Sequence, residues 1–352
     1  MIDWTLAQRI AGGVAGAPDP GSNAAGELPG DLVEMTERAR EGVVAYTRLT
    51  PARAVPAPES VDRAVWLEAN LETMRGTLDP LVARLGGSGP LAAPMRAAGG
   101  ALIAAEIGAI TGFMARHVLG QYDLALLDPA RPPRLLLVAP NLHEAARSMD
   151  VAIDDLLPWV VFHEVTHAVQ FTSVPWLADH LGSLLRELLD SVELRIDPSA
   201  LLRLPSGDDL RGLWDSLREG GLVGAVAGPE RKALLDRLQA TMALIEGHAE
   251  LVMDGAGAPA LPNLPALREA LDRRRREKSP LVKVIERLLG LEMKLRQYEL
   301  GRRFCDGVVE RGGIEALNRA WTGPQRLPRI DELEDPAAWI RRTAVRSVTA
   351  PK

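Results

Sequence analysis

Apolar residues recur three and four positions apart between residues 31 and 118, as in DLVEMTERAREGVVAYTRL and VDRAVWLEANLETMRGTLDPLVARL. This spacing places the apolar side chains on one face of a helix, so we expect a helical layer in this part of the chain. Further segments with helical periodicity lie at residues 155–172, 229–254, 265–278, 280–300 and 301–321. Gly- and Pro-rich breaks separate several of these segments.

Two short apolar runs depart from the helical pattern. They are YDLALLD at residues 122–128 and RLLLVAP at residues 134–140, and a Pro-rich connection joins them. Short apolar runs bounded by turn residues are typical of strands, and the connection suits a longer hairpin loop. The predicted fold class is therefore α+β and mostly α-helical, with a small β-sheet and a helical N-terminal layer.

The chain is long enough to form two closely packed lobes. Its 352 residues exceed the roughly 250–300 residues at which single hydrophobic cores stop growing. We expect a helical N-terminal layer over residues 1–118 and a second region over residues 119–352, unless the two form one continuous domain. Residues 12–30 are rich in Gly, Ala and Pro without periodicity, so we expect a loose surface loop there.

Charge and cysteine content exclude several classes of function. The net charge of −6 disfavours a general affinity for nucleic acid or anionic membranes. Cys305 is the only cysteine, so the chain has no internal disulfide and no cysteine-rich metal site, which fits a cytoplasmic location. The N-terminus lacks the pattern of a signal peptide, and the longest apolar runs are too short to span a membrane. We expect neither a nucleic-acid nor a membrane partner.

The segment DLLPWVVFHEVTHAVQFT predicts a buried helix that carries an HExxH motif. Asp155 is expected to cap this helix, with Pro158 in its first turn. Between residues 156 and 172 the only ionisable side chains are His163, Glu164 and His167. Apolar residues surround the rest of the helix, so these three groups need a compensating partner such as a metal ion or a hydrogen-bonded network.

The spacing of the motif favours a metal ion. His163 and His167 are four residues apart and share one helical face, so both imidazoles can reach one cation, with Glu164 turned slightly aside. Imidazole suits zinc, and a site with three protein ligands leaves a fourth position for water, whose pKa falls to about 7. Glu164 is then placed to accept the proton of that water as a general base. An accidental HExxH on a core helix is the alternative.

A third protein ligand is expected from the segment LIEGHAELVMD at residues 244–254. Its candidates are Glu246, His248 and Glu250. Glu246 and Glu250 are four residues apart, so Glu246 could bind the metal while Glu250 orients a ligand histidine, and His248 points about 160° away from Glu246. Gly247 in mid-helix suggests close approach of another helix. Exposed helix charges are the alternative for both glutamates.

Other sources of a third ligand fit less well. The extended motif HExxHxxGxxH requires Gly and His where this chain has Gln170 and Ser173. Asp179 and His180 are more distant options. The basic run from Arg273 to Arg276 is expected to be a solvated helix face, because acidic residues flank it.

The segments HEVTHAVQF and EGHAEL resemble the gluzincin peptidases, in which a Glu that begins an E-G-x-A segment completes HExxH. Over the whole chain, FHEVTHAVQF, EGHAELVMD, KLRQYELGRRF and LPRIDELEDPAAWIRR resemble a family of uncharacterised zincin-like hydrolases associated with biosynthesis of the deazaflavin coenzyme factor 420. The resemblance implies a zincin-like core, metal ligands at His163, His167 and Glu246, and a general base at Glu164. No Gly-rich cofactor loop follows a strand, so the residues themselves do not indicate a link to that coenzyme.

Two further roles are suggested by comparison with zincins. Gluzincins usually supply a Tyr or His that stabilises the oxyanion, and Tyr298 is the best candidate, although its place on an apolar helical stripe equally suits a packed core tyrosine. An edge strand near the active-site helix can align an extended peptide, and residues 134–140 could serve, unless this strand lies in the sheet core.

We expect a zinc-dependent hydrolase that acts on a peptide or amide bond, with Zn²⁺ as its cofactor. The first alternative is a non-catalytic scaffold or binding protein in which a structural zinc staples two helices. The second is a carboxylate-bridged di-iron protein, since Glu164 and His167 also spell ExxH. That site requires a second ExxH, and the chain has none.

Overall fold

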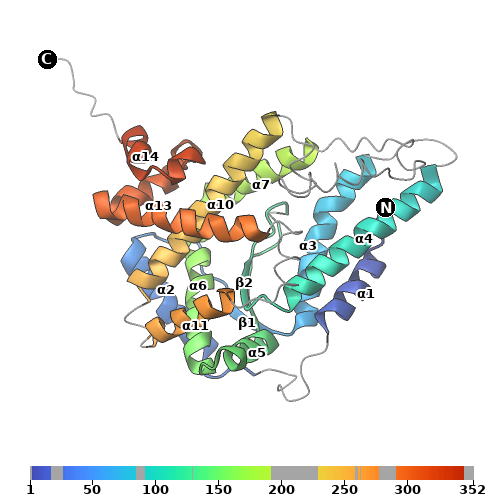
Figure 1. The fold of residues 1–352 in the computed structure, drawn as a ribbon, viewed down its shortest axis with the longest axis horizontal. Coiled ribbons are helices and arrows are strands. Elements are labelled where there is room, and N and C mark those ends of the chain that lie inside the picture. Colours follow the sequence, from blue (N-terminus) through green and yellow to red (C-terminus); the bar gives the residue numbers. More distant parts are fainter. Residues whose placement is uncertain are drawn as a thin grey trace.

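The computed structural model is mostly helical, with one small sheet, as the sequence pattern predicts (Figure 1). It describes residues 2–16, 27–84, 92–128, 130–191, 229–257, 261, 263–276 and 291–344. The helices in these ranges are α1 (Trp4–Ala15), α2 (Leu32–Thr47), α3 (Arg63–Arg84), α4 (Ala92–Ala115), α5 (Ala139–Met149), α6 (Ile153–Ser173), α7 (Pro175–Asp190), α10 (Pro229–Gly255), α11 (Leu264–Arg276), α13 (Leu291–Asn318) and α14 (Pro336–Thr343). The strands are β1 (Pro58–Val61), β2 (Gly120–Asp123) and β3 (Arg134–Val138), and short 3-10 helices lie at Arg319–Thr322, Pro324–Arg326 and Asp331–Leu333.

Strand β3 is the central strand of the sheet. It pairs in parallel with β1 and antiparallel with β2, in the order β1-β3-β2. Successive side chains of a strand point to opposite faces. Leu135 and Leu137 accordingly enter one hydrophobic core and Leu136 and Val138 enter another, and all four are fully buried. β3 therefore forms a wall shared by two cores.

The two cores differ in the helices that cover them. Helices α1, α3 and α4 contribute to the core on the Leu136 face and lie together on one side of the molecule (Figure 1). The larger core on the Leu137 face is built mainly from α2, α5, α6, α7, α10, α11 and α13. Helix α2 thus packs against α6, although it belongs to the predicted N-terminal layer. The division between residues 1–118 and 119–352 stays a prediction.

Helix α6 runs through the larger core and is buried over most of its length, as predicted from its apolar sequence. Its start differs from the prediction. Ala152 is extended and its carbonyl accepts the first helical hydrogen bond, from Leu156, so the helix begins at Ile153. Asp155 therefore lies within the first turn instead of capping the helix, and its carboxylate accepts hydrogen bonds from Asn263. Pro158 lies inside the helix, beyond the first turn.

Several elements differ from the sequence-based expectation. The predicted loop at residues 12–30 begins later, because helix α1 extends to Ala15; residues 17–26 lie outside the described part of the chain. The second strand ends at Val138, since Pro140 sits in the first turn of α5. The predicted break at residue 300 is absent, because α13 continues until Gly313, which adopts φ 71°. Residues 280–290 lie outside the described ranges.

The sequence pattern does not predict β1, α5, α7 or α14. β1 has only four residues, PESV, and exists because it pairs with β3, which lies far away in sequence. Among the described residues, no helix is both long enough and apolar enough to cross a membrane.

Helices α10 and α13 approach each other most closely at two glycines. A Cβ on Gly247 would overlap the backbone of Gly301, and a Cβ on Gly301 would overlap the carbonyl of Ala243. The close approach expected at Gly247 is therefore present, but the partner is α13 and not the HExxH helix. Because Gly247 follows Glu246 directly, this contact with α13 fixes the position of the α10 backbone next to Glu246.

We predict that Gly247→Ala destabilises the protein by at least about 1–3 kcal/mol, because the added methyl forces α10 and α13 apart. Denaturant unfolding followed by circular dichroism measures this change. Gly76→Ala is the matched control: Gly76 is also in a helix, but a Cβ there meets nothing within 4 Å. The control should raise stability by about 0.4–1 kcal/mol. Equal effects of the two substitutions would contradict the close helix contact.

Candidate metal centre

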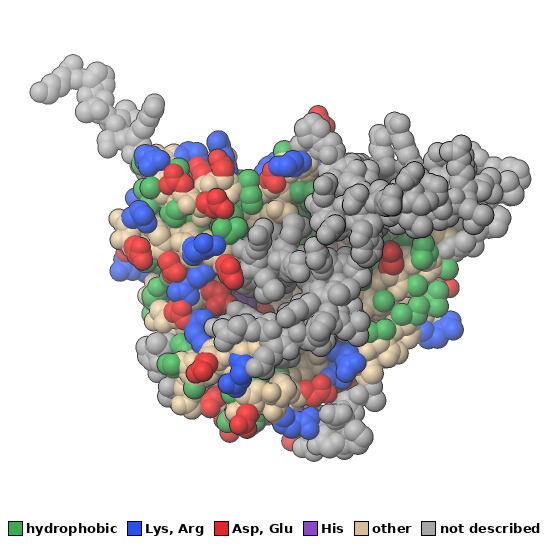
Figure 2. All heavy atoms as spheres, in the orientation of Figure 1, with side chains coloured by type: hydrophobic (Ala, Val, Ile, Leu, Met, Phe, Trp, Pro, Cys, Tyr) green, Lys and Arg blue, Asp and Glu red, His purple; other side chains and the backbone are tan. Residues whose placement is uncertain are grey.

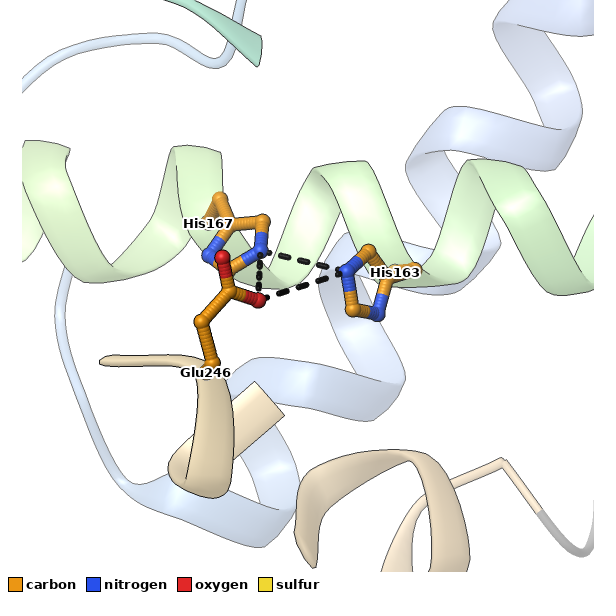
Figure 3. A group of neighbouring side chains, drawn as sticks. All are labelled: His163, His167 and Glu246. Carbon is orange, nitrogen blue, oxygen red and sulfur yellow. Dashed lines mark hydrogen bonds and ion pairs between the residues drawn. The ribbon is translucent and has the colours of Figure 1, made fainter. Parts of the chain in front are cut away.

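Three side chains converge where helices α6 and α10 cross in the larger core (Figure 3). His163 and His167 come from successive turns of α6, and Glu246 comes from α10. The two Nε2 atoms are 3.2 Å apart. Glu246 Oε2 lies 3.9 Å from the Nε2 atom of His163 and 3.5 Å from that of His167. Of the three candidates for a third ligand, the structure thus places Glu246 at the histidines.

The spacing of these atoms fits a metal ion. A point equidistant from the three atoms lies about 2.1 Å from each, and zinc binds imidazole nitrogen and carboxylate oxygen at about 2.0–2.2 Å. Two imidazoles and one carboxylate are also a ligand set found in catalytic zinc sites, which leave a further position open. The residues present can therefore hold a zinc ion without rearrangement of the helices.

Little of each converging side chain is exposed. The exposed fractions are 16% for His163, and 12% each for His167 and Glu246. Figure 2 shows only a small area of histidine surface, next to acidic side chains. The group is therefore largely withdrawn from water.

The two histidines differ in their affinity for protons. Burial lowers the pKa of His167, but the charge and hydrogen bond of Glu246, together with smaller effects of Glu164 and Gln170, outweigh it, and the pKa rises to about 9. Burial and the neighbouring positive charge of His167 lower the pKa of His163. Without a metal, one proton on His167 therefore balances Glu246 at neutral pH. A divalent cation would take the place of that proton.

Gln170 contacts His167 at Nδ1, the ring nitrogen that does not face the other two converging side chains. The Nδ1 atom of His167 lies 2.9 Å from Gln170 Oε1, and the amide of Gln170 donates to the carbonyl of Ile245 at 3.1 Å. The same amide lies 2.8 Å from Nδ1 of His248. His248 is fully buried and packs edge-on against Trp321. Burial, followed by the charge of His167, lowers the pKa of His248 to about 3.

Glu164 is held against strand β2. Its Oε2 atom accepts a hydrogen bond of 2.8 Å from the backbone N–H of Tyr122, and the residue is 9% exposed. No hydrogen bond reaches Oε1 from the part of the chain that the structure describes. A Cβ on Gly120 would lie 2.8 Å from both Glu164 Cγ and Val160 Cγ1. Strand β2 can therefore lie this close to α6 only because residue 120 is glycine.

His163 is enclosed by an aromatic ring and a buried carboxylate. Trp159 stacks on its imidazole with 5.9 Å between ring centroids. Its Nδ1 atom is buried and makes no hydrogen bond with described residues. Glu250 lies near enough to raise the pKa of His163, against the larger effect of burial, but its Oε2 atom accepts a hydrogen bond from Arg268 at 3.1 Å.

The remaining sequence-based candidates lie elsewhere. Tyr298 belongs to α13, but its side chain is outside the described residues. His180 packs edge-on against Trp176 and lines a separate cavity of about 550 Å³ together with Arg237. The strand at 134–140 is central in the sheet, so the alternative of a sheet-core strand is the correct one and β2 is an edge strand. Sequence reasoning missed Gln170 and Gly120; a buried amide one turn after a ligand histidine is the signal that could have revealed the former.

We predict that Gly120→Ala displaces Glu164 and costs about 1–3 kcal/mol of folding free energy, because the new methyl overlaps two side chains of α6. Chemical denaturation measures the cost. Val160→Ala removes one of the two overlaps. It should therefore destabilise the Gly120→Ala protein less than it destabilises the wild type. Strictly additive effects would show that β2 does not press on α6 at this point.

Comparison with known proteins gives two matches that cover nearly the whole chain. The family model for zincin-like metallopeptidases matches residues 2–340. A crystal structure from Chloroflexus aurantiacus, described as a candidate hydrolase with a novel fold, is 28% identical with a TM-score of 0.68, and the match covers 97% of this chain and 98% of that chain. No curated protein gives a significant match. The chain therefore belongs to the zincin-like metallopeptidase family.

Proposed function

We propose that this protein is a zinc-dependent hydrolase that cleaves a peptide or amide bond. The observation that carries the proposal is the convergence of His163, His167 and Glu246 to metal-binding distances, with the Glu164 carboxylate held beside them. Membership of the zincin-like family and the description of the Chloroflexus protein as a candidate hydrolase support it. The link to deazaflavin coenzyme biosynthesis stays a prediction from sequence resemblance.

His163, His167 and Glu246 would hold the zinc ion. When bound, zinc polarises a carbonyl group and makes water acidic enough to ionise near neutral pH. The two helices that carry the ligands are tightly packed in the core, so the ligands are oriented before the metal arrives. Glu250 is proposed to act on His163 through its nearby negative charge, because its Oε2 atom accepts from Arg268 and Nδ1 of His163 makes no hydrogen bond with the described residues.

Glu164 is proposed to be the general base. The Tyr122 N–H occupies Oε2 and keeps the carboxylate in one rotamer, while Oε1 is left to accept a proton. A carboxylate that holds a proton in this position can later return it to the leaving amine. Tyr298 is proposed to stabilise the oxyanion, as the resemblance to gluzincins suggests.

Strand β2 offers a way to bind an extended peptide. The register with β3 and the hydrogen bond from Val138 N–H to the Leu119 carbonyl direct the main-chain groups of Gly120 and Tyr122 away from β3. The Tyr122 N–H on that side reaches Glu164, so this edge faces the proposed base. Carbonyl groups along the same edge could accept N–H groups of a substrate backbone. A peptide or other amide substrate fits this edge.

We predict that untagged protein binds one zinc ion per chain, measured by mass spectrometry after dialysis. His163→Ala and Glu246→Gln should each weaken zinc binding by more than about 100-fold, because direct ligands exceed the 10–100-fold effect of their supporting partners. His180→Ala is the control, since His180 lies in a separate cavity. Stoichiometric zinc in both ligand variants would contradict the assignment of the ligands.

We predict that Glu164→Gln keeps zinc but lowers hydrolysis of a fluorogenic peptide library by about 10²–10⁴-fold, because an amide cannot accept the proton. Glu230→Gln, an exposed substitution on α10, is the control. Full activity in zinc-loaded Glu164→Gln would contradict the general-base role. A wild type that hydrolyses nothing and unfolds when zinc is removed would instead identify a zinc-stapled scaffold.

A further inference from the structure

Gln170 is the buried polar side chain that joins the two ligand helices directly behind the metal group. It lies one turn after His167 on α6 and is fully buried. Its amide bonds to the backbone carbonyl of Ile245, the residue that precedes Glu246 on α10. One side chain therefore contacts a ligand histidine and the backbone next to the ligand glutamate.

The Ile245 carbonyl decides the orientation of this amide. A carbonyl oxygen can only accept hydrogen bonds, so the NH₂ group of Gln170 must face Ile245, which turns Oε1 toward His167. An amide oxygen also only accepts, so Nδ1 of His167 must carry a hydrogen. In the neutral imidazole this leaves the lone pair on Nε2, the atom that faces His163 and Glu246.

We propose that Gln170 is a positioning residue of the metal centre that holds His167 in the tautomer and ring orientation needed to bind the metal through Nε2. The inference rests on the proposed function, because it assigns the residue that prepares one of the proposed ligands. Partners of this kind fix the tautomer of a ligand histidine and raise its basicity, so that its free nitrogen binds the metal more strongly. Here the partner also ties that histidine to the helix of the third ligand.

His248 completes the arrangement from the far side. Its Nδ1 lies 2.8 Å from the amide nitrogen of Gln170, and since that nitrogen donates, Nδ1 must accept. The second hydrogen of the NH₂ group is thereby satisfied in a fully buried position. The Trp321 ring lies perpendicular to the His248 ring, with 5.3 Å between ring centroids, and confines it. Among the described residues, the hydrogen bond with Gln170 is therefore the contact through which we infer that His248 supports the metal centre.

The test compares Gln170→Leu with a matched control on the same helix. Leucine approximates the volume of glutamine but provides neither the acceptor nor the donors. Thr172→Val is the control, because Thr172 is buried on α6 and its hydroxyl bonds only to carbonyls of its own helix. Zinc affinity is measured by chelator competition on protein shown to be folded by circular dichroism. The visible spectrum of the Co²⁺-loaded protein reports ligand geometry, and NMR reports the Nδ1–H hydrogen of His167.

We expect Gln170→Leu to weaken zinc binding by about 10–100-fold, to change the Co²⁺ spectrum and to lose the protected Nδ1–H resonance. Thr172→Val should leave all three unchanged. A folded Gln170→Leu protein with wild-type zinc affinity and Co²⁺ spectrum would overturn the positioning role while leaving the metal centre intact. Failure of the wild type itself to bind zinc would overturn the proposed function and this role together.

His248→Phe provides a second variant that keeps an aromatic ring against Trp321 but removes the acceptor. It should weaken zinc binding less than Gln170→Leu, because the Ile245 carbonyl still orients the amide. In the Gln170→Leu background the same substitution should have no further effect on zinc affinity. Additive losses in the double variant would overturn the inference that His248 acts through Gln170.

Discussion

The structure depends on the burial of three ionisable side chains at the crossing of two helices. His163, His167 and Glu246 lie almost entirely within an apolar core, where unpaired charge costs several kcal/mol. Without a metal, a proton on His167 faces Glu246 and offsets part of this cost. The same arrangement leaves three donor atoms around a point at zinc-ligand distance. A divalent cation at this point would neutralise the buried Glu246 carboxylate in place of the proton on His167.

The rest of the fold keeps this crossing in place. Strand β3 separates two hydrophobic cores, and β2 beside it presses on α6 at Gly120. On the other side, Gly247 brings α10 against α13 next to the ligand Glu246. Each glycine removes the one Cβ that would prevent close packing. The metal group is therefore held from two directions, because the backbone of β2 lies against side chains of α6 and the backbone of α13 lies against α10.

The parts of the site that the sequence could predict are those that depend on local spacing. HExxH places His163 and His167 on one face of α6, and a helical repeat of four relates Glu246 to Glu250. Buried character could also be predicted, because α6 is apolar on all sides. These properties belong to single helices, so they can be read without knowing how the helices meet.

The contacts that could not be predicted join residues far apart in sequence. In the sequence, Gln170 is one polar residue near a helix end. Its role becomes visible only in the fold, where α10 brings the Ile245 carbonyl and His248 to its amide. The hydrogen bond from Tyr122 to Glu164 depends on the pairing of β2 with β3. β1 and the edge position of β2 follow from the same pairing. Such contacts are set by the tertiary packing, for which a single sequence has no periodic signal.

Helix α6 contributes many side chains to the larger core and also carries most of the residues proposed for chemistry. Active-site residues often lie on loops above a rigid scaffold, where they can change independently of the core. Here Val160, Glu164 and Gln170 link the same helix to β2 and α10. A change at the site therefore alters core packing, and a change in core packing moves the ligands. The gain is that the ligands are oriented before metal binds, so that little conformational entropy remains to be lost on binding.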